Sequence, residues 1–499
     1  MSAHRPHDDE MEGMEDNEED AMINQEDIEE EVPEGDDVAM DSDEEQETIE
    51  EIQLQNDSAA HFDAHKDSIF CIAQHPLNPS IVATGGGDDV AYVWDCTPAE
   101  RPVLPASYQS NPQPQERKSL ETLAKLEGHT DSINAIAFSQ PKGDFVLTAG
   151  LDGKVSAYHT PSQSGPARLL GSAQEVEEIN WLQPCPNPEH PNTFALGASD
   201  GSVWVYTINA SEADTPLNIV QAFYLHTAAC TAGTWTPDGK LLATVSEDSS
   251  LYVWDVFGDA AAAGLADPSS SGGGQAVVGL TAADERFFVD GGLYSIAVSP
   301  SGAIAAVGGA DGHIRIVGLP RLSMPAQSVT SGAKGAGARN KAAGGKQAGG
   351  PTGGKSQAAS GQAGVILANL QAQSDGVESL AFSPIPLTFL AAGSVDGSIA
   401  LFDAAHNFAC RRHIKDAHEE EAVIKVEFVN TPTKERNHLL TSCGNDGVIR
   451  RWDVRGGTAA VNQGFSGEWR GHRGGGEGGG ILGFVQGGDA KQIVTAGDE

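Results

Sequence analysis

Short runs of alternating apolar and polar residues recur along the chain from about residue 61, separated by turns rich in glycine and aspartate. In the first unit, His65 is followed by the run Ile69–Ile72; a second run ends at Thr84, a turn carries Asp88, and a third run contains Trp94. Alternation with a period of two predicts β-strands, and the turns between them predict antiparallel pairing. The chain is therefore predicted to be all-β and built from a repeated unit of short strands.

The repeated unit keeps a fixed internal spacing. In seven copies, an aspartate in the turn lies six residues before an aromatic or apolar residue of the third strand. These aspartates are Asp88, Asp152, Asp200, Asp248, Asp311, Asp396 and Asp446. An eighth unit starts at Gly471-His472 and reaches its turn at Asp498, so its third strand is missing. Residues 52–62 are expected to supply the outermost strand of this unit, and how the array closes is left open.

Three units contain a histidine, a hydroxyl residue, the turn aspartate and a tryptophan at matching positions. The sets are His65, Thr84, Asp88 and Trp94; His226, Thr244, Asp248 and Trp254; and His418, Ser442, Asp446 and Trp452. Such a quartet can form a buried relay in which the carboxylate accepts from the imidazole, the hydroxyl bonds the imidazole, and the indole N–H donates to the hydroxyl. A catalytic site would occur once, whereas this set recurs in three units. We therefore interpret the quartets as structural and predict that the chain is not an enzyme.

Gly-His at the start of units and Trp-Asp at the end of third strands are features of a known repeat. With Gly128-His129, Gly471-His472 and Trp94-Asp95, residues 51–499 resemble the WD-repeat family. The resemblance implies a β-propeller, in which four-stranded sheets stand around a central channel. Eight recognisable units favour eight blades, with seven as the alternative.

A narrower resemblance rests on the acidic N-terminus, on Ala64–Phe70, and on Thr84–Asp89 before Val93-Trp94. These features look like the angio-associated migratory cell protein family, whose fungal branch includes a dedicated chaperone for one large-subunit ribosomal protein, L-ten or universal L-sixteen. The resemblance implies capture of that basic protein during its synthesis and its delivery to precursors of the 60S subunit.

Charge is distributed unevenly along the chain. The formal net charge is −41, and the first 51 residues hold 24 acidic side chains and one arginine. Residues 1–50 are therefore predicted to be a disordered acidic tail, and residues 51–499 the propeller, with flexible Gly- and Ala-rich insertions at 258–275 and 331–364. Such an acidic chain should repel nucleic acid and anionic membranes and favour basic partners.

Carboxylates recur where each innermost strand is predicted to start. Asp67, Asp131, Asp290, Asp375 and Glu421 are aligned at one position. Three positions further on, Glu177 and Glu378 share a slot with Phe70, and Glu175, Glu178 and Glu247 lie nearby. An aspartate at such a place also favours a turn through its own hydrogen bonds to the backbone. We hypothesise that these acids form a negative funnel for a Lys/Arg-rich peptide, with Phe70 stacking on a guanidinium.

Together with this charge pattern, the narrower resemblance implies a chaperone that binds the basic N-terminal region of the ribosomal protein and supports 60S assembly. The alternative is a general interaction scaffold, such as a histone or chromatin escort or a ubiquitin-ligase substrate receptor. No cofactor or metal is expected, since Cys185 and His190 alone are too few for a zinc site. The chain is expected to be a monomer in the cytoplasm, and also in the nucleus, because its six cysteines lack disulfide spacing and no apolar run reaches the roughly 18 residues of a membrane span.

Overall fold

The computed structural model describes residues 56–98, 119–161, 165–212, 214–265, 276–322, 362–456, 461–472, 474, 479–488 and 490–498. The chain divides into two units, Met1–Gln53 and Leu54–Glu499, and all described residues belong to the second. The predicted acidic tail, residues 266–275 of the first insertion and residues 331–361 of the second lie outside the described residues.

Seven four-stranded antiparallel sheets, here called blades 1 to 7, make up most of the unit. From the inner to the outer strand, blades 1 to 3 are β1 (Ile69–Gln74), β2 (Ile81–Gly86), β3 (Ala91–Asp95), β4 (Thr122–Leu126); β5 (Ile133–Phe138), β6 (Phe145–Gly150), β7 (Lys154–His159), β8 (Leu169–Gln174); β9 (Ile179–Pro184), β10 (Thr193–Ala198), β11 (Val203–Ile208), β12 (Leu217–Phe223). Blades 4 and 5 are β13 (Cys230–Trp235), β14 (Leu241–Ser246), β15 (Leu251–Asp255), β16 (Ala276–Leu280); β17 (Leu293–Val298), β18 (Ile304–Gly309), β19 (His313–Gly318), β20 (Ile366–Gln371). Blades 6 and 7 are β21 (Val377–Phe382), β22 (Phe389–Ser394), β23 (Ile399–Asp403), β24 (Ala409–Ile414); β26 (Val423–Phe428), β27 (Leu439–Gly444), β28 (Val448–Asp453), β29 (Phe465–Arg470).

The prediction of an all-β propeller is confirmed, but the preferred count of eight blades is not supported, and the alternative of seven is. The eighth unit forms only a two-stranded sheet, β30 (Ile481–Gln486) and β31 (Ile493–Gly497). The expected outer strand from residues 52–62 is also absent from its described part, since residues 56–62 form no strand. Within the described part of the chain, this unit therefore has two of the four strands of a blade.

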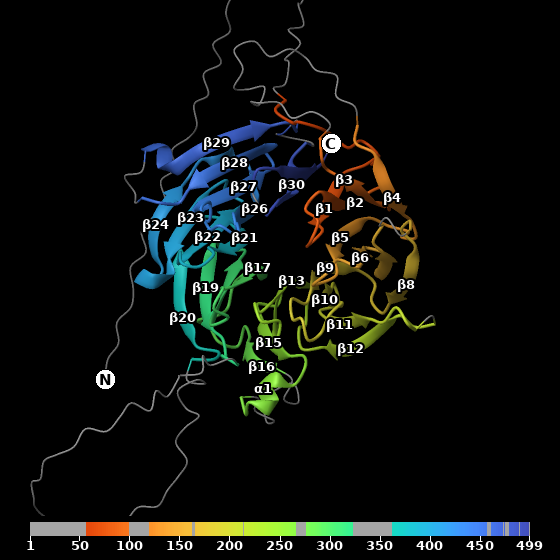
Figure 1. Cartoon of the computed structure of the whole chain (residues 1–499). Coiled ribbons are helices and arrows are strands. Elements are labelled where there is room, and N and C mark those ends of the chain that lie inside the picture. Colours follow the sequence, from red (N-terminus) through yellow and green to blue (C-terminus); the bar gives the residue numbers. More distant parts are fainter. Residues whose placement is uncertain are drawn as a thin grey trace, which may run out of the picture. The chain divides into compact units, whose positions relative to one another are not determined.

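The innermost strands follow one another around the centre of the ring in Figure 1. Each of β1, β5, β9, β13, β17, β21, β26 and β30 contacts the next, and β30 contacts β1. Gln492 also donates a hydrogen bond from Nε2 to the carbonyl of Cys96 at 2.6 Å, and Val485 and Val494 pack against the core of blade 1. The two-stranded sheet thus closes the ring against blade 1.

Residues 56–62 bridge the outer side of this junction. The Asp57 N–H donates to the carbonyl of Arg470 in β29 at 2.6 Å, and Phe62 stacks on Trp94 with ring centroids 4.6 Å apart. Phe223, which ends β12, stacks on Trp254 in the same way at 4.4 Å. Phe62 therefore occupies the place where the outermost strand of a preceding blade ends, although the described residues before it, 56–61, form no strand.

Middle strands are buried because blades cover them on both faces. All residues of β6, β10 and β14 are buried, and these strands consist of apolar, small and hydroxyl residues without alternation. Outer strands such as β8 carry exposed residues on one face, as expected for strands at the rim. The core lies between blades in separate clusters, so each blade is held by its two neighbours.

A β-bulge interrupts the pairing of the innermost strand with the second strand in all eight sheets. In blades 2, 3 and 4 the extra residue donates a side-chain hydrogen bond to the first carbonyl of the next innermost strand. The pairs are Asn134 to Ile179 at 2.6 Å, Asn180 to Cys230 at 3.1 Å and Thr231 to Leu293 at 2.6 Å. Bulges therefore tie neighbouring blades together near the start of their innermost strands.

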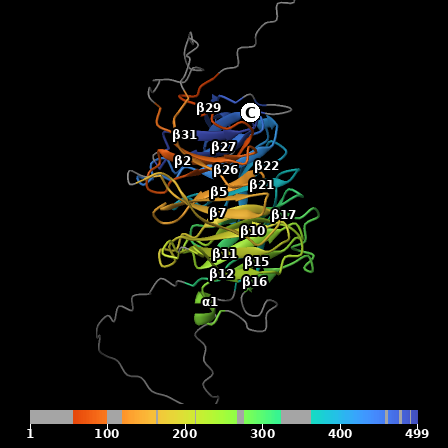
Figure 2. The same ribbon diagram turned by 90° about the vertical axis from the view of Figure 1, so that its right-hand side faces the viewer.

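Connections alternate between the two ends of the ring because the strands are antiparallel. The start of each innermost strand and the turn after the second strand lie at one end, here called the mouth; the loops after the first and third strands lie at the other. Helix α1 (Asp259–Ala262), which follows β15, projects beyond the sheets in Figures 1 and 2. Short 3-10 turns η2 (Ala404–His406) and η3 (Val461–Gly464) and the short strand β25 (Ala417–Glu420) complete the described elements. Among the described residues, no helix has the length and hydropathy needed to cross a membrane.

Candidate binding face at the mouth of the propeller

Hydrogen bonds join the four members of the quartet in blade 1. His65 lies 3.0 Å from Asp88 Oδ1 through Nδ1 and 2.9 Å from Thr84 Oγ1 through Nε2, and the Trp94 indole donates to the same hydroxyl at 3.1 Å. Blade 7 repeats this pattern: His418 contacts Asp446 at 2.8 Å and Ser442 at 2.7 Å, and Trp452 donates to Ser442 at 2.9 Å.

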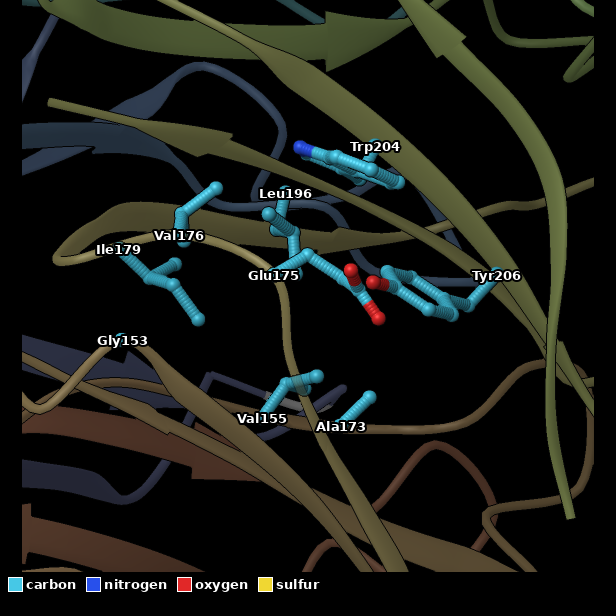
Figure 3. Close-up of a pocket in the computed structure, with 9 residues that line it drawn as sticks. All are labelled: Gly153, Val155, Ala173, Glu175, Val176, Ile179, Leu196, Trp204 and Tyr206. Atoms are coloured by element: carbon cyan, nitrogen blue, oxygen red, sulfur yellow. The ribbon is translucent and has the colours of Figure 1, made fainter. Parts of the chain in front are cut away.

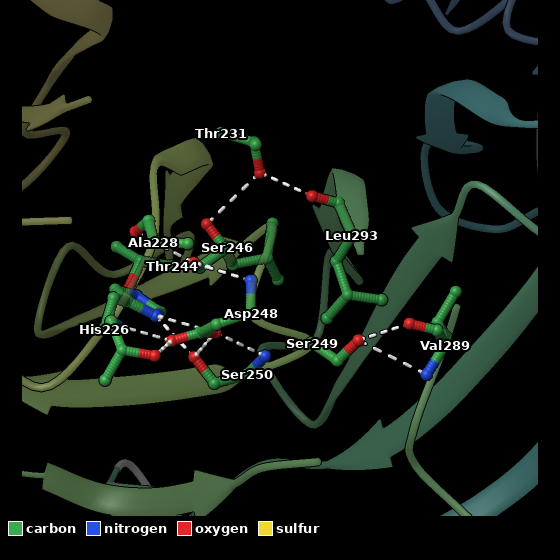
Figure 4. A network of polar contacts seen from close by, with 12 residues as sticks. His226, Ala228, Thr231, Thr244, Ser246, Asp248, Ser249, Ser250, Val289 and Leu293 are labelled. Atoms are coloured by element: carbon green, nitrogen blue, oxygen red, sulfur yellow. Dashed lines mark hydrogen bonds and ion pairs between the residues drawn. The ribbon is translucent and has the colours of Figure 1, made fainter. Parts of the chain in front are cut away.

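Blade 4 differs from the expected relay at one link (Figure 4). His226 contacts Thr244 at 2.8 Å, and Trp254 donates to Thr244 at 2.8 Å. The imidazole Nδ1, however, lies 2.6 Å from Ser250 Oγ and 3.9 Å from Asp248, because the Ser250 hydroxyl, which donates to Asp248, stands between them. The expected direct bond from imidazole to carboxylate is thus replaced by one through a serine.

The turn aspartates also fix the loops that lead into the innermost strands. Asp152 accepts from the Thr130 N–H at 3.0 Å, Asp248 from the Thr227 N–H at 2.6 Å, and Asp396 from the Ser374 N–H at 2.8 Å. Burial opposes ionisation of Asp152, but hydrogen bonds from Thr130 and His129 outweigh it and lower the pKa of this carboxyl. The Asp152 carboxylate therefore stays ionised and holds the loop before the innermost strand in place.

Five carboxylates stand at one equivalent position of the mouth, two residues before the innermost strand begins. They are Asp67, Asp131, Glu177, Asp375 and Glu421. This set corrects the sequence alignment: Glu177 joins it because β9 begins at Ile179, whereas Asp290 stands one residue earlier, with Gly291 at the equivalent position. The alignment failed in blade 3 because no histidine marks the start of that unit.

The slot predicted for Phe70, Glu177 and Glu378 is the bulge position. Phe70 and Glu378 do share it, but in blade 3 it is occupied by Asn180 rather than by Glu177. Phe70 is 39% exposed, in keeping with a side chain at the mouth. Glu247 lies in the turn after β14, at the same end of the ring, and Glu175 and Glu178 lie in the loop before β9.

All but one of the ten predicted acids are exposed, Glu421 being half-buried. Within the part of the chain that the structure describes, none of them lies within 4.0 Å of a lysine, arginine or histidine nitrogen, although many other acids do. Three accept a local backbone hydrogen bond: Asp67 from Ser68, Asp131 from Ser132 and Asp375 from Gly376, at 2.7 to 2.8 Å. These three aspartates therefore stabilise the local turn and also carry a charge that no nearby cation of the described residues neutralises.

The charges of neighbouring blades influence one another. Burial and the adjacent charge of Asp375 raise the pKa of Glu378. Burial, together with the charges of Glu247 and Glu378, raises the pKa of Tyr294, which lies between them at the bulge of β17. The carboxylates of Glu247 and Glu378, from blades 4 and 6, thus act on the same side chain at the mouth, where a cation would relieve the repulsion.

Comparison with known proteins identifies relatives along most of the chain. The model of the WD domain, G-beta repeat, matches residues 56–95, 120–159, 217–255, 287–317 and 364–403. The ribosome assembly protein SQT1 of Saccharomyces cerevisiae is 34% identical over 227 residues, which span 44% of this chain and 46% of that protein, less than half of its length. The human angio-associated migratory cell protein is 23% identical over 441 residues, covering 88% of this chain and 78% of that protein.

A solved structure is more similar still. The crystal structure of Chaetomium thermophilum Sqt1 bound to the N-terminus of the ribosomal protein L10 superposes with a TM-score of 0.72. The two chains are 50% identical, and the match covers 89% of this chain and 98% of the solved one. Repeats, propeller architecture and this similarity agree: the chain belongs to the WD-repeat β-propeller family, among the relatives of Sqt1 and the angio-associated migratory cell protein.

Proposed function

We propose that this chain is a dedicated escort that binds the basic N-terminal region of a large-subunit ribosomal protein of the L10 type and supports 60S assembly. The observation that carries the proposal is the 50% identity, over 89% of the chain, to a Sqt1 whose structure holds the N-terminus of L10. The uncompensated carboxylates at the mouth supply the chemistry that such a ligand needs.

The position of the carboxylates suits an extended basic peptide. Glu177, Asp375, Glu421 and their two equivalents come from five different sheets but stand at the same end of the ring. Hydrogen bonds between a carboxylate and a guanidinium are about twice as strong as neutral ones. A surface of one sign also steers an oppositely charged partner and raises its association rate.

The hydrogen-bonded turns prepare the mouth for binding. Because Asp152, Asp248 and Asp396 bond the backbone of the loops, these loops need little further ordering when a ligand arrives. Less conformational entropy is then lost on binding, which favours affinity. Capture of the ribosomal protein during its synthesis would place this chain in the cytoplasm, and delivery to early 60S precursors would also take it into the nucleus. One copy of the chain holds the whole site, so a monomer suffices.

The test is a binding measurement with a peptide of the L10 N-terminus from the same organism, followed by fluorescence anisotropy. Reversing two mouth charges, Glu177→Lys with Glu378→Lys, should weaken binding at least about 30-fold, since two charge-assisted contacts are lost. The matched control, Glu212→Lys with Glu435→Lys, makes the same charge change on loops at the other end of the ring and should stay within about twofold of the unmodified chain at physiological salt, where screening is strong.

Equal losses in both double variants would reduce the effect to net charge, and no loss in the first would remove the mouth as the site. Affinity purification of the intact chain distinguishes the other functions considered. Histones or ubiquitin-ligase subunits in place of L10 and 60S assembly factors would overturn the proposal in favour of a different interaction module.

A further inference from the structure

Blade 3 lacks the quartet that stabilises blades 1, 4 and 7. Glu175 stands four residues before β9, where His65 and His226 stand before their strands. Leu196 replaces the hydroxyl residue, and Tyr206 replaces the tryptophan. The unit therefore places a carboxylate where its counterparts place a buried imidazole.

Blade 3 keeps an aromatic ring at the position that packs against the imidazole in blades 1 and 4. In blade 1 the His65 ring packs edge-on against Tyr92 at 4.7 Å, and in blade 4 His226 packs against Tyr252 at 5.0 Å. Trp204 is the equivalent residue in blade 3, since it pairs with Leu196 as Tyr92 pairs with Thr84. Its indole thus lacks the partner that the equivalent tyrosines have.

A hollow marks the place of the missing imidazole. It is a shallow hollow, partly open to solvent, with about 160 Å³ of space between atoms when open solvent is included, and Glu175, Leu196, Trp204 and Tyr206 are among its lining residues. Figure 3 shows the Glu175 side chain lying across it, with the carboxylate toward Tyr206. As it stands the hollow is too narrow for a free water molecule, so a larger group enters only when Glu175, an exposed side chain, turns outward.

A second aromatic residue packs against Trp204. Tyr224 is 65% exposed and packs edge-on against Trp204, with ring centroids 5.8 Å apart and an angle of 86° between the planes. Two perpendicular rings beside a carboxylate form a corner that attracts a cation through both the ring faces and the charge. Among the described residues, the two cation–π contacts involve Phe484 and Trp469, so no lysine or arginine of the described chain covers Trp204.

We propose that Glu175, Trp204 and Tyr224 bind one arginine side chain of the ligand, with its guanidinium against the indole and its charge paired with Glu175. A flat guanidinium matches a slot that a flat imidazole fills in the sister blades, whereas an ammonium group is compact and more strongly hydrated. The identity of the ligand rests on the proposed function, but the arginine site itself depends only on the geometry of blade 3.

The test uses the full chain labelled with 5-fluorotryptophan, whose seven tryptophans give separate fluorine resonances, with Trp204→Phe assigning the signal of Trp204. The first probe is the tripeptide acetyl-Gly-Arg-Gly-amide, with citrulline and lysine analogues. We expect the arginine probe to shift the Trp204 resonance, the lysine probe to bind more weakly, and the uncharged citrulline probe to leave it unchanged. Glu175→Gln should weaken the arginine probe roughly five- to tenfold, while Glu435→Gln at the far end of the ring should change nothing.

No shift of Trp204 at millimolar arginine probe, or an equal shift with citrulline, would overturn the proposal. A second arm adds the L10 peptide to the same sample. If the peptide binds without moving the Trp204 resonance, the client does not use this corner, and the inference fails while the proposed function stands. If the tripeptide binds but the L10 peptide does not, the arginine site stands and the proposed function fails.

Discussion

Replacing Thr244 by valine tests whether the buried quartets hold the blades. The Thr244 hydroxyl accepts from the Trp254 indole and bonds His226 Nε2, both at 2.8 Å, and Thr244 and Trp254 are 0% and 1% exposed. Valine keeps the shape but removes both hydrogen bonds, and it leaves an indole N–H and an imidazole nitrogen buried without partners. Two lost bonds at about 1 kcal/mol each, plus stranding at about 1–3 kcal/mol, give a loss of roughly 3–5 kcal/mol in the free energy of unfolding.

Urea unfolding followed by tryptophan fluorescence measures this loss from the shift of the midpoint at constant slope. The control is Thr122→Val, which changes an exposed threonine in the outer strand β4 and should alter stability by less than about 0.5 kcal/mol. If Thr244→Val lowers the free energy of unfolding as little as the control does, the Thr244 hydroxyl does not stabilise the blade. The interpretation of the quartets as structural would then be wrong.

Two further predictions concern acid sensitivity and packing. Burial lowers the pKa of His418 although Asp446 opposes this shift, so the unfolded chain binds a proton that the folded chain does not. The free energy of unfolding should therefore fall as the pH drops below about 6.5. In urea titrations at several pH values, His418→Gln should remove up to about 1.4 kcal/mol per pH unit of this dependence. Gly197→Ala would bring a Cβ into collision with the Trp181 indole at Nε1, which should cost about 1–3 kcal/mol in the free energy of unfolding. Trp181→Leu in the same chain should recover part of this loss, and additive losses in a double-mutant cycle would contradict the clash.

The repeat, the strands and the quartets could be predicted because they are local. The turn aspartate and the aromatic residue six positions later lie in one hairpin, so spacing alone relates Asp88 to Trp94. The alignment of residues at the starts of the innermost strands was harder to predict from the sequence. Without a histidine, nothing in the sequence marks where β9 begins, and Glu177 was placed three positions away from its true equivalents.

Features that depend on contacts between distant segments could not be read from the sequence. Phe62 meets Trp94 across the closure of the ring, and β30 closes the ring by its contacts with β26 and β1, which lie far from it in the sequence. The corner of Glu175, Trp204 and Tyr224 was missed as a unit, since only Glu175 was selected, for its charge. The signal that could have found it is a repeat that lacks both the histidine and the hydroxyl, as at Leu196, but keeps an aromatic residue, Trp204, at the position of Tyr92.

Connections alternate between the two ends of the ring, so long insertions can lie at one end while the proposed ligand binds at the other. Loops after β15 and β19 leave from the end opposite the mouth, and the insertions at 258–275 and 331–364 fall in them. Lengthening a loop costs little free energy when its ends stay fixed, roughly 0.6 kcal/mol for each doubling. Related chains can therefore gain or shed such segments, and with them whole new contacts, while the carboxylates on the far side keep their spacing.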